Sequence, residues 1–346
     1  MNMKEDQLSP RERVMEALAG REPDRVPWIE LELGQMLVDK MLGHPTTAIN
    51  MPNDMYNRGI EEEKKFSRLV GKDNVQFCFR PPIFCNFEIG KDNRHFYGKG
   101  HIQTHSDLNK IVFPDLGDKK YLKPARQFVK NKEEFAAMAA TRLGFAAVML
   151  SMGMENFFES LYRDKELILE VLDRYTKWLS RAVEIISDIG FDFIAACDDM
   201  AIKTGPMISP KMIEEIFFPS MKKVADSISI PFFTHSDGNM FPLMEMWLKL
   251  GQNAIHPIEP AAMDIREVKN QYGSKICIIG NVDVELLAEG TTDEIDTVVR
   301  DLIRDIAPGG GYILSSGNML TDYSKVENVW AMSKALKVYG RYPIAA

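Results

Sequence analysis

Cysteine is scarce in this sequence. Only four of the 346 residues are cysteines, at positions 78, 85, 197 and 277, and no two form a CxxC pair. That spacing argues against a cysteine-based structural zinc cluster and against a thioredoxin-like motif. Isolated cysteines of this kind are typical of buried free thiols in a reducing compartment.

Long apolar runs are also missing. No apolar stretch approaches the roughly 18 residues that cross a membrane, and the N-terminal residues are polar and charged. We therefore expect a cytoplasmic protein with neither a signal peptide nor a membrane span.

Excess basic charge is absent too. The 42 Lys and Arg residues are outnumbered by 50 Asp and Glu residues, which gives a net charge of −8 and argues against a nucleic-acid surface. No GxGxxG or GxxxxGK[ST] phosphate loop follows any candidate strand, which disfavours a nucleotide-binding open sheet.

The chain does contain a regular alternation of strand-like and helix-like segments. Short apolar segments alternate with helical patterns of ten or more residues, which indicates a parallel sheet. The predicted strands are 26–33, 74–80, 145–150, 191–198, 231–236, 253–258, 275–281 and 311–316. The predicted helices from the middle of the chain onward are 132–141, 154–162, 164–189, 209–227, 240–250, 264–271, 292–306 and 324–339. Eight strands favour a closed (β/α)₈ TIM barrel.

Two segments add to this barrel. Ser9 and Pro10 are a typical N-cap and first residue of a helix, so we predict an N-terminal helix over 9–20. Residues at about 84–105 are aromatic and glycine-punctuated, which predicts a β-hairpin insertion. The interpretation is one barrel domain covering residues 1–346.

The carboxyl ends of the predicted strands gather the reactive side chains. In a barrel these ends form one mouth, where function resides. The ring contains Glu30, Glu32, Ser151, Met152, Asp198, Asp199, His235, Asp237, His256, Glu259, Asn281, Asp283, Ser315, Ser316 and Asn318. It is rich in acids, includes two histidines and has no basic residue, which suits a divalent cation or proton transfer between paired acids.

Three of these side chains form the predicted metal site. Asp199, His235 and Glu214, which stands in the first turns of the helix after Asp199, would supply two carboxylates and one imidazole. That set suits zinc with an open fourth position, and also manganese or iron. The sequence leaves open whether Asp237 or Asp199 is the ligand. Asp237 before Gly238 could also simply make a turn, and His256 before Pro257 could be a packed core histidine.

Several motifs resemble the uroporphyrinogen decarboxylase superfamily. They run in the same order over residues 10–340, and they are Arg11-Glu12-Arg13-Val14, 22–27, His235-Ser236-Asp237-Gly238, 254–260, Gly280-Asn281-Val282-Asp283, 309–314 and Glu327-Asn328-Val329. The resemblance implies a (β/α)₈ barrel with its cleft at the carboxyl ends of the strands. True uroporphyrinogen decarboxylases hold their anionic substrate with an Arg-Gln-Ala-Gly-Arg segment, which here is Trp28-Ile29-Glu30-Leu31-Glu32-Leu33-Gly34. Because acids replace the arginines, porphyrinogen decarboxylation is disfavoured.

The chain looks closer to the zinc methyltransferases that work with corrinoid proteins. The thiol-activating members use His-x-Cys and a distant Cys, whereas this chain has His235-Ser236-Asp237 and Ser316-Gly317-Asn318. Ether-cleaving O-demethylases carry a Glu, a second Glu fifteen residues on and a His twenty-one further, and Asp199, Glu214 and His235 are similar to that pattern with Asp first.

This resemblance implies a methyl transfer from a small O-methyl substrate to cobalamin on a partner corrinoid protein, with zinc or another divalent metal activating the substrate. The catalytic residues would be His235, Asp237 and Glu30. Substrate-binding roles would fall to Glu32, Asp198, His256, Glu259, Asn318 and Arg80.

Two alternatives remain open from the sequence. One is a metal-independent decarboxylase that uses an Asp–His pair, with Arg80 to hold an anionic substrate. The other is a non-catalytic binding subunit. A homodimer is also left open.

Overall fold

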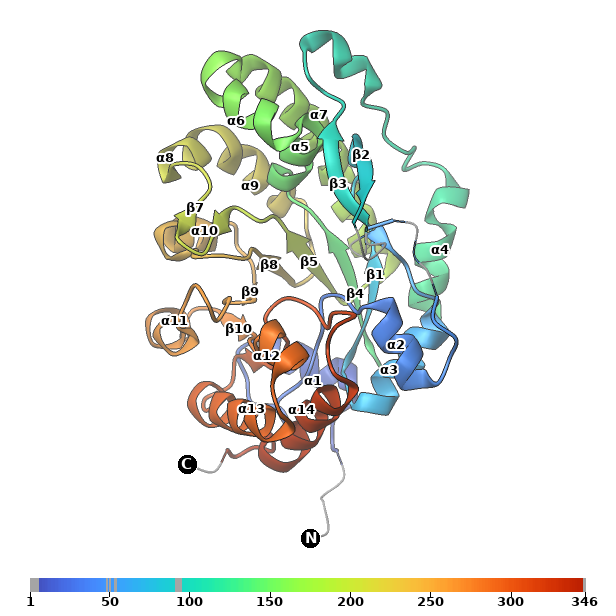
Figure 1. Cartoon of the computed structure of the whole chain (residues 1–346), viewed down its shortest axis with the longest axis vertical. Helices are drawn as coiled ribbons and strands as arrows, with labels where there is room; N and C mark the ends of the chain where they lie inside the picture. Colours follow the sequence, from blue (N-terminus) through green and yellow to red (C-terminus); the bar gives the residue numbers. More distant parts are fainter. Residues whose placement is uncertain (1–5, 48, 50, 53–54, 91–94, 345–346) are drawn as a thin grey trace.

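Seven parallel strands form the central sheet of the computed structural model, which describes residues 6–47, 49, 51–52, 55–90 and 95–344. In sheet order they are β1 (Asn74–Cys78), β4 (Ala136–Thr141), β5 (Phe193–Cys197), β8 (Phe232–His235), β9 (Ala254–His256), β10 (Cys277–Ile279) and β11 (Tyr312–Ile313). This order follows the chain, and the helices between the strands lie on the outer side of the curled sheet (Figure 1). The fold is therefore TIM-barrel-like.

The predicted first strand, 26–33, is not a regular strand. Trp28 makes a parallel bridge to Leu314 beside β11, and its carbonyl accepts the Asp73 N–H at 2.7 Å beside β1. On the β1 side, the Asn74 amide exchanges hydrogen bonds with the backbone of Glu30 at 3.0 and 3.1 Å. On this side a side chain thus replaces part of the backbone pairing, so the segment lies between the two sheet edges and, within the described residues, adds no eighth strand to the sheet.

The predictions of a helix over 132–141 and a strand over 145–150 are wrong. Residues 136–141 form β4, which pairs with β1 on one side and β5 on the other, and residues Phe145–Met152 form helix α5. Alanine-rich β4 favours a helix by local propensity, but burial of all its residues between two strands decides its structure. Helix α5 is buried along nearly its whole length, so it lacks the polar face that would have identified it.

The N-terminal helix and the hairpin insertion are confirmed. Helix α1 (Pro10–Leu18) starts with a capping box between Ser9 and Glu12, and β2 (Cys85–Ile89) pairs antiparallel with β3 (His95–Gly100). The remaining elements are α2 (Gln35–Leu42), α3 (Ile60–Val70), η2 (His105–Lys110), α4 (Lys119–Lys130), α6 (Met154–Arg163), α7 (Lys165–Ile189), β6 (Ala201–Ile202), β7 (Gly205–Pro206), α8 (Pro210–Met212), η3 (Ile213–Phe217), α9 (Phe218–Asp226), η4 (Phe241–Leu243), α10 (Met244–Leu248), α11 (Ile265–Tyr272), α12 (Val284–Glu289), α13 (Thr292–Ile306) and α14 (Val326–Tyr339).

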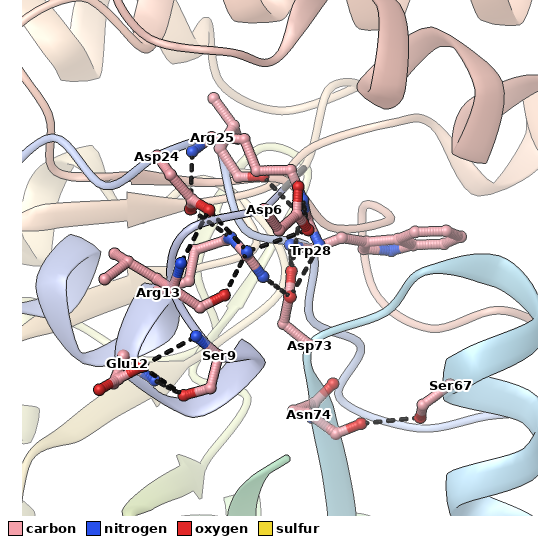
Figure 2. A network of polar contacts seen from close by, with 12 residues as sticks. Asp6, Ser9, Glu12, Arg13, Asp24, Arg25, Trp28, Ser67, Asp73 and Asn74 are labelled. Atoms are coloured by element: carbon pink, nitrogen blue, oxygen red, sulfur yellow. Dashed lines mark hydrogen bonds and ion pairs between the residues drawn. The ribbon is translucent and has the colours of Figure 1, made fainter. Parts of the chain in front are cut away.

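A buried ion network fixes the start of the chain to β1 (Figure 2). Arg13 donates to Asp24 at 2.7 Å and to Asp73 at 2.6 Å, and Arg25 donates to Asp73 at 2.9 Å. Asp73 also accepts the Trp28 N–H at 2.8 Å. Because Arg13 and Asp73 are each 1% exposed, this network holds helix α1 and the segment after it against the amino end of the sheet.

The apolar interior has two parts. The larger cluster fills the space between the sheet and the outer helices, and the smaller one lies inside the curled sheet. Val14, Ala17 and Leu18 of α1 belong to the inner cluster together with strand residues such as Phe193 and Ile313. Helix α1 therefore covers the amino end of the sheet, and the polar groups described below lie at its carboxyl end. Within the described residues, no helix combines the length and the apolar character that crossing a bilayer requires.

Candidate functional site

Asp199, His235 and Asp237 form one cluster at the carboxyl end of the sheet. His235 ends β8 and is the register partner of Cys197, the last residue of β5, so Asp199 follows β5 at the same level. The His235 Nε2 atom lies 3.5 Å from Asp199 Oδ1 and 3.7 Å from Asp237 Oδ1. One donor atom from each of the three residues falls within 4.8 Å of the others, a spacing that one metal ion can bridge.

The loop after β8 positions Asp237. The Asp237 N–H donates to Asp199 Oδ1 at 3.1 Å, and the next N–H, from Gly238, donates to Glu259 Oε2 at 2.8 Å. Gly238 has a φ of +83°, and a Cβ there would lie 2.5 Å from the carbonyl carbon of Ala201. Only glycine fits this close approach, which confirms the turn at Asp237-Gly238, and a turn there is compatible with a site role for Asp237.

The surroundings of the Asp237 carboxyl group disfavour its negatively charged form. Burial, with the nearby charges of Asp199 and Glu259, raises its pKa to about 8, against the opposing hydrogen bond from Asn318 Nδ2 to Oδ2 at 2.6 Å. Its other oxygen, Oδ1, is buried and has no hydrogen-bond partner among the described residues. Oδ1 is also the atom nearest His235, so a divalent cation would satisfy an orphaned acceptor and relieve the repulsion between the carboxylates.

His235 can offer a lone pair to a cation. Burial, helped by the positive charges of Arg80 and Arg142, lowers its pKa to about 3, so the ring is neutral at neutral pH. Its second nitrogen, Nδ1, lies 2.7 Å from Nδ1 of His256. His256 therefore contacts His235 inside the protein. The sequence had predicted a substrate-binding role for His256.

Glu214, the predicted third ligand, stands outside this cluster. It is exposed on η3, a π-helical turn between α8 and α9, and it is not among the three grouped donors. The structure thus brings together Asp199 and His235 as predicted, but the second carboxylate is that of Asp237.

Asp198 faces away from the cluster and caps a helix. Its carboxylate accepts the backbone N–H groups of Leu143, Gly144 at 3.2 Å and Ala146 at 2.6 Å, at the start of α5. Burial raises its pKa to about 6. The contacts indicate a structural role for Asp198, which was predicted to bind substrate.

Glu30 is buried beside the last strand. Its Oε1 accepts from Trp28 Nε1 at 2.6 Å and from the Ser316 N–H at 3.1 Å, and Oε2 accepts from Ser316 Oγ at 2.6 Å. Burial raises its pKa to about 7. These contacts tie the 26–33 segment to the residues after β11, and Glu30 is not part of the three-residue cluster.

Sequence reasoning missed Arg142 in the ring. The prediction that the strand ends carry no basic residue is wrong, because Arg142 directly follows β4 and is 5% exposed, with a hydrogen bond to the Cys197 carbonyl at 3.3 Å. Arg80, which follows β1, forms an ion pair with Glu32 at 2.7 Å. A correct assignment of β4 as a strand would have placed Arg142 at the mouth.

A second group, Asp39, His44 and Glu62, also has metal-compatible spacing. Its carboxylates already have partners: Asp39 accepts from Gln35 Nε2 at 2.8 Å and from the Thr47 N–H at 2.6 Å, and Glu62 lies 3.5 Å from Arg58 Nε. These contacts account for the closeness of the three side chains, because they hold the loop that follows α2.

Fold and site together define a TIM-barrel-like α/β protein with an acid- and imidazole-lined site at the carboxyl ends of its strands. The chain belongs to the uroporphyrinogen decarboxylase (URO-D) family, whose model matches residues 85–339, so the resemblance noted in the sequence is confirmed. A uroporphyrinogen decarboxylase of Methylobacillus flagellatus is 20% identical over 254 residues, 68% of this chain and 69% of the relative. One of Neisseria meningitidis serogroup C is 21% identical over 245 residues, 66% and 67% of the two chains.

A solved structure extends the likeness over almost the whole fold. A methyltransferase from Methanosarcina mazei superposes with a TM-score of 0.74 at 18% sequence identity, covering 96% of this chain and 99% of the other. At that identity the likeness concerns the fold.

Proposed function

We propose that this protein is a methyltransferase that moves a methyl group from a small O-methylated substrate to cobalamin on a partner corrinoid protein. Asp199, His235 and Asp237 would hold a divalent metal ion, with zinc as the preferred candidate. The observation that carries the proposal is the orphaned, buried Oδ1 of Asp237 facing the neutral Nε2 of His235 and the carboxylate of Asp199.

The three residues divide the task of holding the cation. His235 provides a neutral nitrogen, while Asp199 and Asp237 provide oxygen atoms and compensating negative charge. Asn318 fixes the Asp237 carboxylate through Oδ2, which leaves Oδ1 directed at the cation site. When bound, the metal would supply Lewis acidity to the oxygen that carries the methyl group.

The donor set favours an oxygen-bound methyl group. Thiolate-rich zinc sites suit thiol substrates, and in this chain Asp237 and Asn318 stand where the thiol-activating methyltransferases that it resembles carry cysteines. The nearest strand cysteine, Cys197, is buried, and burial raises the pKa of its thiol to about 12. It therefore remains a packed thiol.

The reaction balances without an oxidant or reductant. In such a transfer the methyl–oxygen bond would break with its electron pair on oxygen, cob(I)alamin would supply the electron pair that takes up the methyl group, and solvent would protonate the oxygen. The carboxyl end of the sheet is the side from which both partners would approach.

Metal titration of matched variants tests the proposal. Wild-type protein freed of metal should bind one zinc ion, and His235→Ala or Asp237→Asn should weaken binding by more than about 100-fold, beyond the loss seen for supporting residues. Glu214→Gln is the control, because its exposed carboxylate is outside the cluster and should leave the affinity unchanged. Methyl transfer to cob(I)alamin, followed by absorbance with a panel of methoxylated substrates, should depend on the same residues.

A second candidate is a metal-independent decarboxylase. The observation in its favour is that the raised pKa of Asp237 keeps its carboxyl group protonated to about pH 8 beside His235, with Arg80 and Arg142 close enough to affect the imidazole. Decarboxylation that persists with a chelator would select this function. Absence of both activities with every substrate and partner tested would select a non-catalytic binding subunit.

A further inference from the structure

Three carboxylates lie together at the turn that follows β8. The N–H of Asp237 donates to Asp199 Oδ1 at 3.1 Å, and the N–H of Gly238 donates to Glu259 Oε2 at 2.8 Å. Asp199, Asp237 and Glu259 are all partly exposed, so a molecule that enters from the carboxyl end of the sheet meets their charges. Glu259 therefore lies next to the proposed metal ligands, although it is not one of the three grouped donors.

The backbone just before Glu259 has an unusual conformation. Ile258 has a φ of +57°, in the left-handed region that a β-branched residue rarely adopts, and it is 5% exposed. Its carbonyl accepts a hydrogen bond from Asn281 Nδ2 at 2.5 Å. Strain of this kind persists only where the surrounding structure imposes it, and it clusters at functional sites. Because Ile258 sets the direction in which the chain reaches Glu259, the strain is an independent indication that the place of this carboxylate matters.

Two positive charges at the same end of the sheet are buried and have partners. The Arg80 side chain is 4% exposed and pairs with Glu32 at 2.7 Å. Arg142 is 5% exposed and donates to the Cys197 carbonyl at 3.3 Å. Lys203, on the turn between β6 and β7, is exposed, so water and salt screen its charge. A small molecule at the metal cluster therefore meets carboxylates before it meets a guanidinium group.

Glu259 leaves the site with an excess negative charge. A bound divalent cation keeps its carboxylate ligands ionised, so its two positive charges balance Asp199 and Asp237. Glu259 is not needed for this balance, and its carboxylate stays uncompensated. An anionic substrate would be repelled by that charge, whereas an uncharged or cationic substrate would not.

We propose that Glu259 is a specificity-determining residue that excludes anionic substrates, so that the methyl donor is an uncharged or cationic methyl ether. The inference rests on the proposed function, because it names the substrate class of the same site. The sequence predicted that Glu259 binds substrate, and the structure gives that role a content, namely discrimination by charge. If Arg80 held the substrate instead, the opposite preference for an anion would be expected.

Ligands that differ in charge but hardly in shape test the preference. 4-Methoxybenzenesulfonate is an anion and a weak metal ligand, 4-methoxyphenyl methyl sulfone is uncharged, and (4-methoxyphenyl)trimethylammonium is a cation. Ligand-observed NMR titration measures their binding to zinc-loaded protein at low salt. The sulfone and the ammonium ion should each bind about 10-fold more tightly than the sulfonate, for one excess charge at about 6 Å and an effective dielectric constant of about 40. Tighter binding of the sulfonate, or failure of all three to bind, would overturn the proposal.

Glu259→Gln tests the residue itself. The glutamine oxygen can still accept the Gly238 N–H, so the turn is kept while one negative charge is lost. The ratio of the sulfonate and sulfone dissociation constants should fall from about 10 to near one. Glu184→Gln is the matched control, because it removes an exposed charge near the end of α7 that leads into β5, at the opposite end of the sheet. A ratio that stays at the wild-type value in Glu259→Gln would contradict the proposal.

Separate measurements distinguish the possible failures. Zinc content and thermal unfolding show whether Glu259→Gln is loaded and folded. If it is not, raising the salt from about 20 mM to about 500 mM should lower the wild-type ratio, and a ratio that ignores salt would count against the proposal. If wild-type protein binds no zinc, the proposed metal centre fails, and the uncompensated carboxylates should exclude the sulfonate more strongly. Absence of methyl transfer to cob(I)alamin across the methoxylated panel would refute the proposed function, while the binding ratio still decides the charge preference.

Discussion

Glu30 should make the stability of this protein depend on pH near neutrality. It is fully buried, and burial raises its pKa from an ordinary 4.5 to about 7. The folded protein therefore binds this proton more tightly than the unfolded chain does. The stabilisation by the proton is complete below about pH 4.5 and is lost as the pH rises through about 7.

The structure gives the size of the effect. A shift from 4.5 to about 7 corresponds to about 3 kcal/mol of unfolding free energy, of which about 2–3 kcal/mol should be lost between pH 5 and pH 8. In Glu30→Gln the side-chain oxygen can still accept from Trp28 Nε1 and the Ser316 N–H, and the amide can donate to Ser316 Oγ. The variant keeps the contacts but loses the proton equilibrium.

Urea unfolding at several pH values measures the difference. The unfolding free energy of wild type minus that of Glu30→Gln should fall by about 2–3 kcal/mol from pH 5 to pH 8. Glu155→Gln, at an exposed position on α6, is the control and should follow wild type throughout. A difference that stays flat, or that rises with pH, would refute the reasoning from burial.

Three other substitutions test the supports of the fold and site. Arg13→Leu removes the guanidinium group that Asp24 and Asp73 share and leaves Asp73 with Arg25 alone, so it should cost about 3–5 kcal/mol in urea unfolding, whereas loss of the exposed ion pair in Arg163→Ala should cost less than about 1 kcal/mol. Gly238→Ala forces a Cβ against the Ala201 backbone, so it should lower both the melting temperature and the zinc affinity, while Gly59→Ala, with open space around it, should change neither. Asp198→Ala removes three backbone hydrogen bonds at the start of α5 and should destabilise the protein by at least about 2 kcal/mol without abolishing zinc binding.

Much of the fold was predictable because most strands and helices carry clear periodicity. Six of the predicted strands and the long helices α7 and α13 lie where the sequence placed them. The exchange of β4 and α5 has a physical cause: both segments are buried on all sides, so neither shows a polar face, and alanine composition then points the wrong way. The 26–33 segment has a strand-like pattern, but its partner on one side is the Asn74 side chain, which no periodicity reveals.

The site was predictable only as far as strand ends define it. Asp199 and His235 follow from their places after β5 and β8. Spacing along the chain suggested Glu214, but the direction of a side chain on the π-helical turn η3 is set by backbone geometry that residue intervals do not encode. Asp237 was identified as an alternative, and its orphaned oxygen became visible only with the tertiary structure.

The segment that lies between β1 and β11 also has a consequence for biosynthesis. Glu30 and its partner Ser316 are 286 residues apart, and in Figure 1 the first blue segments lie beside the last red ones. At about 5–20 residues per second, a ribosome needs some tens of seconds between making one partner and the other. During that time the apolar face of α1 lacks part of its final cover, since Ile313 belongs to the same inner cluster. The N-terminal helix therefore reaches its final packing only when synthesis is nearly complete.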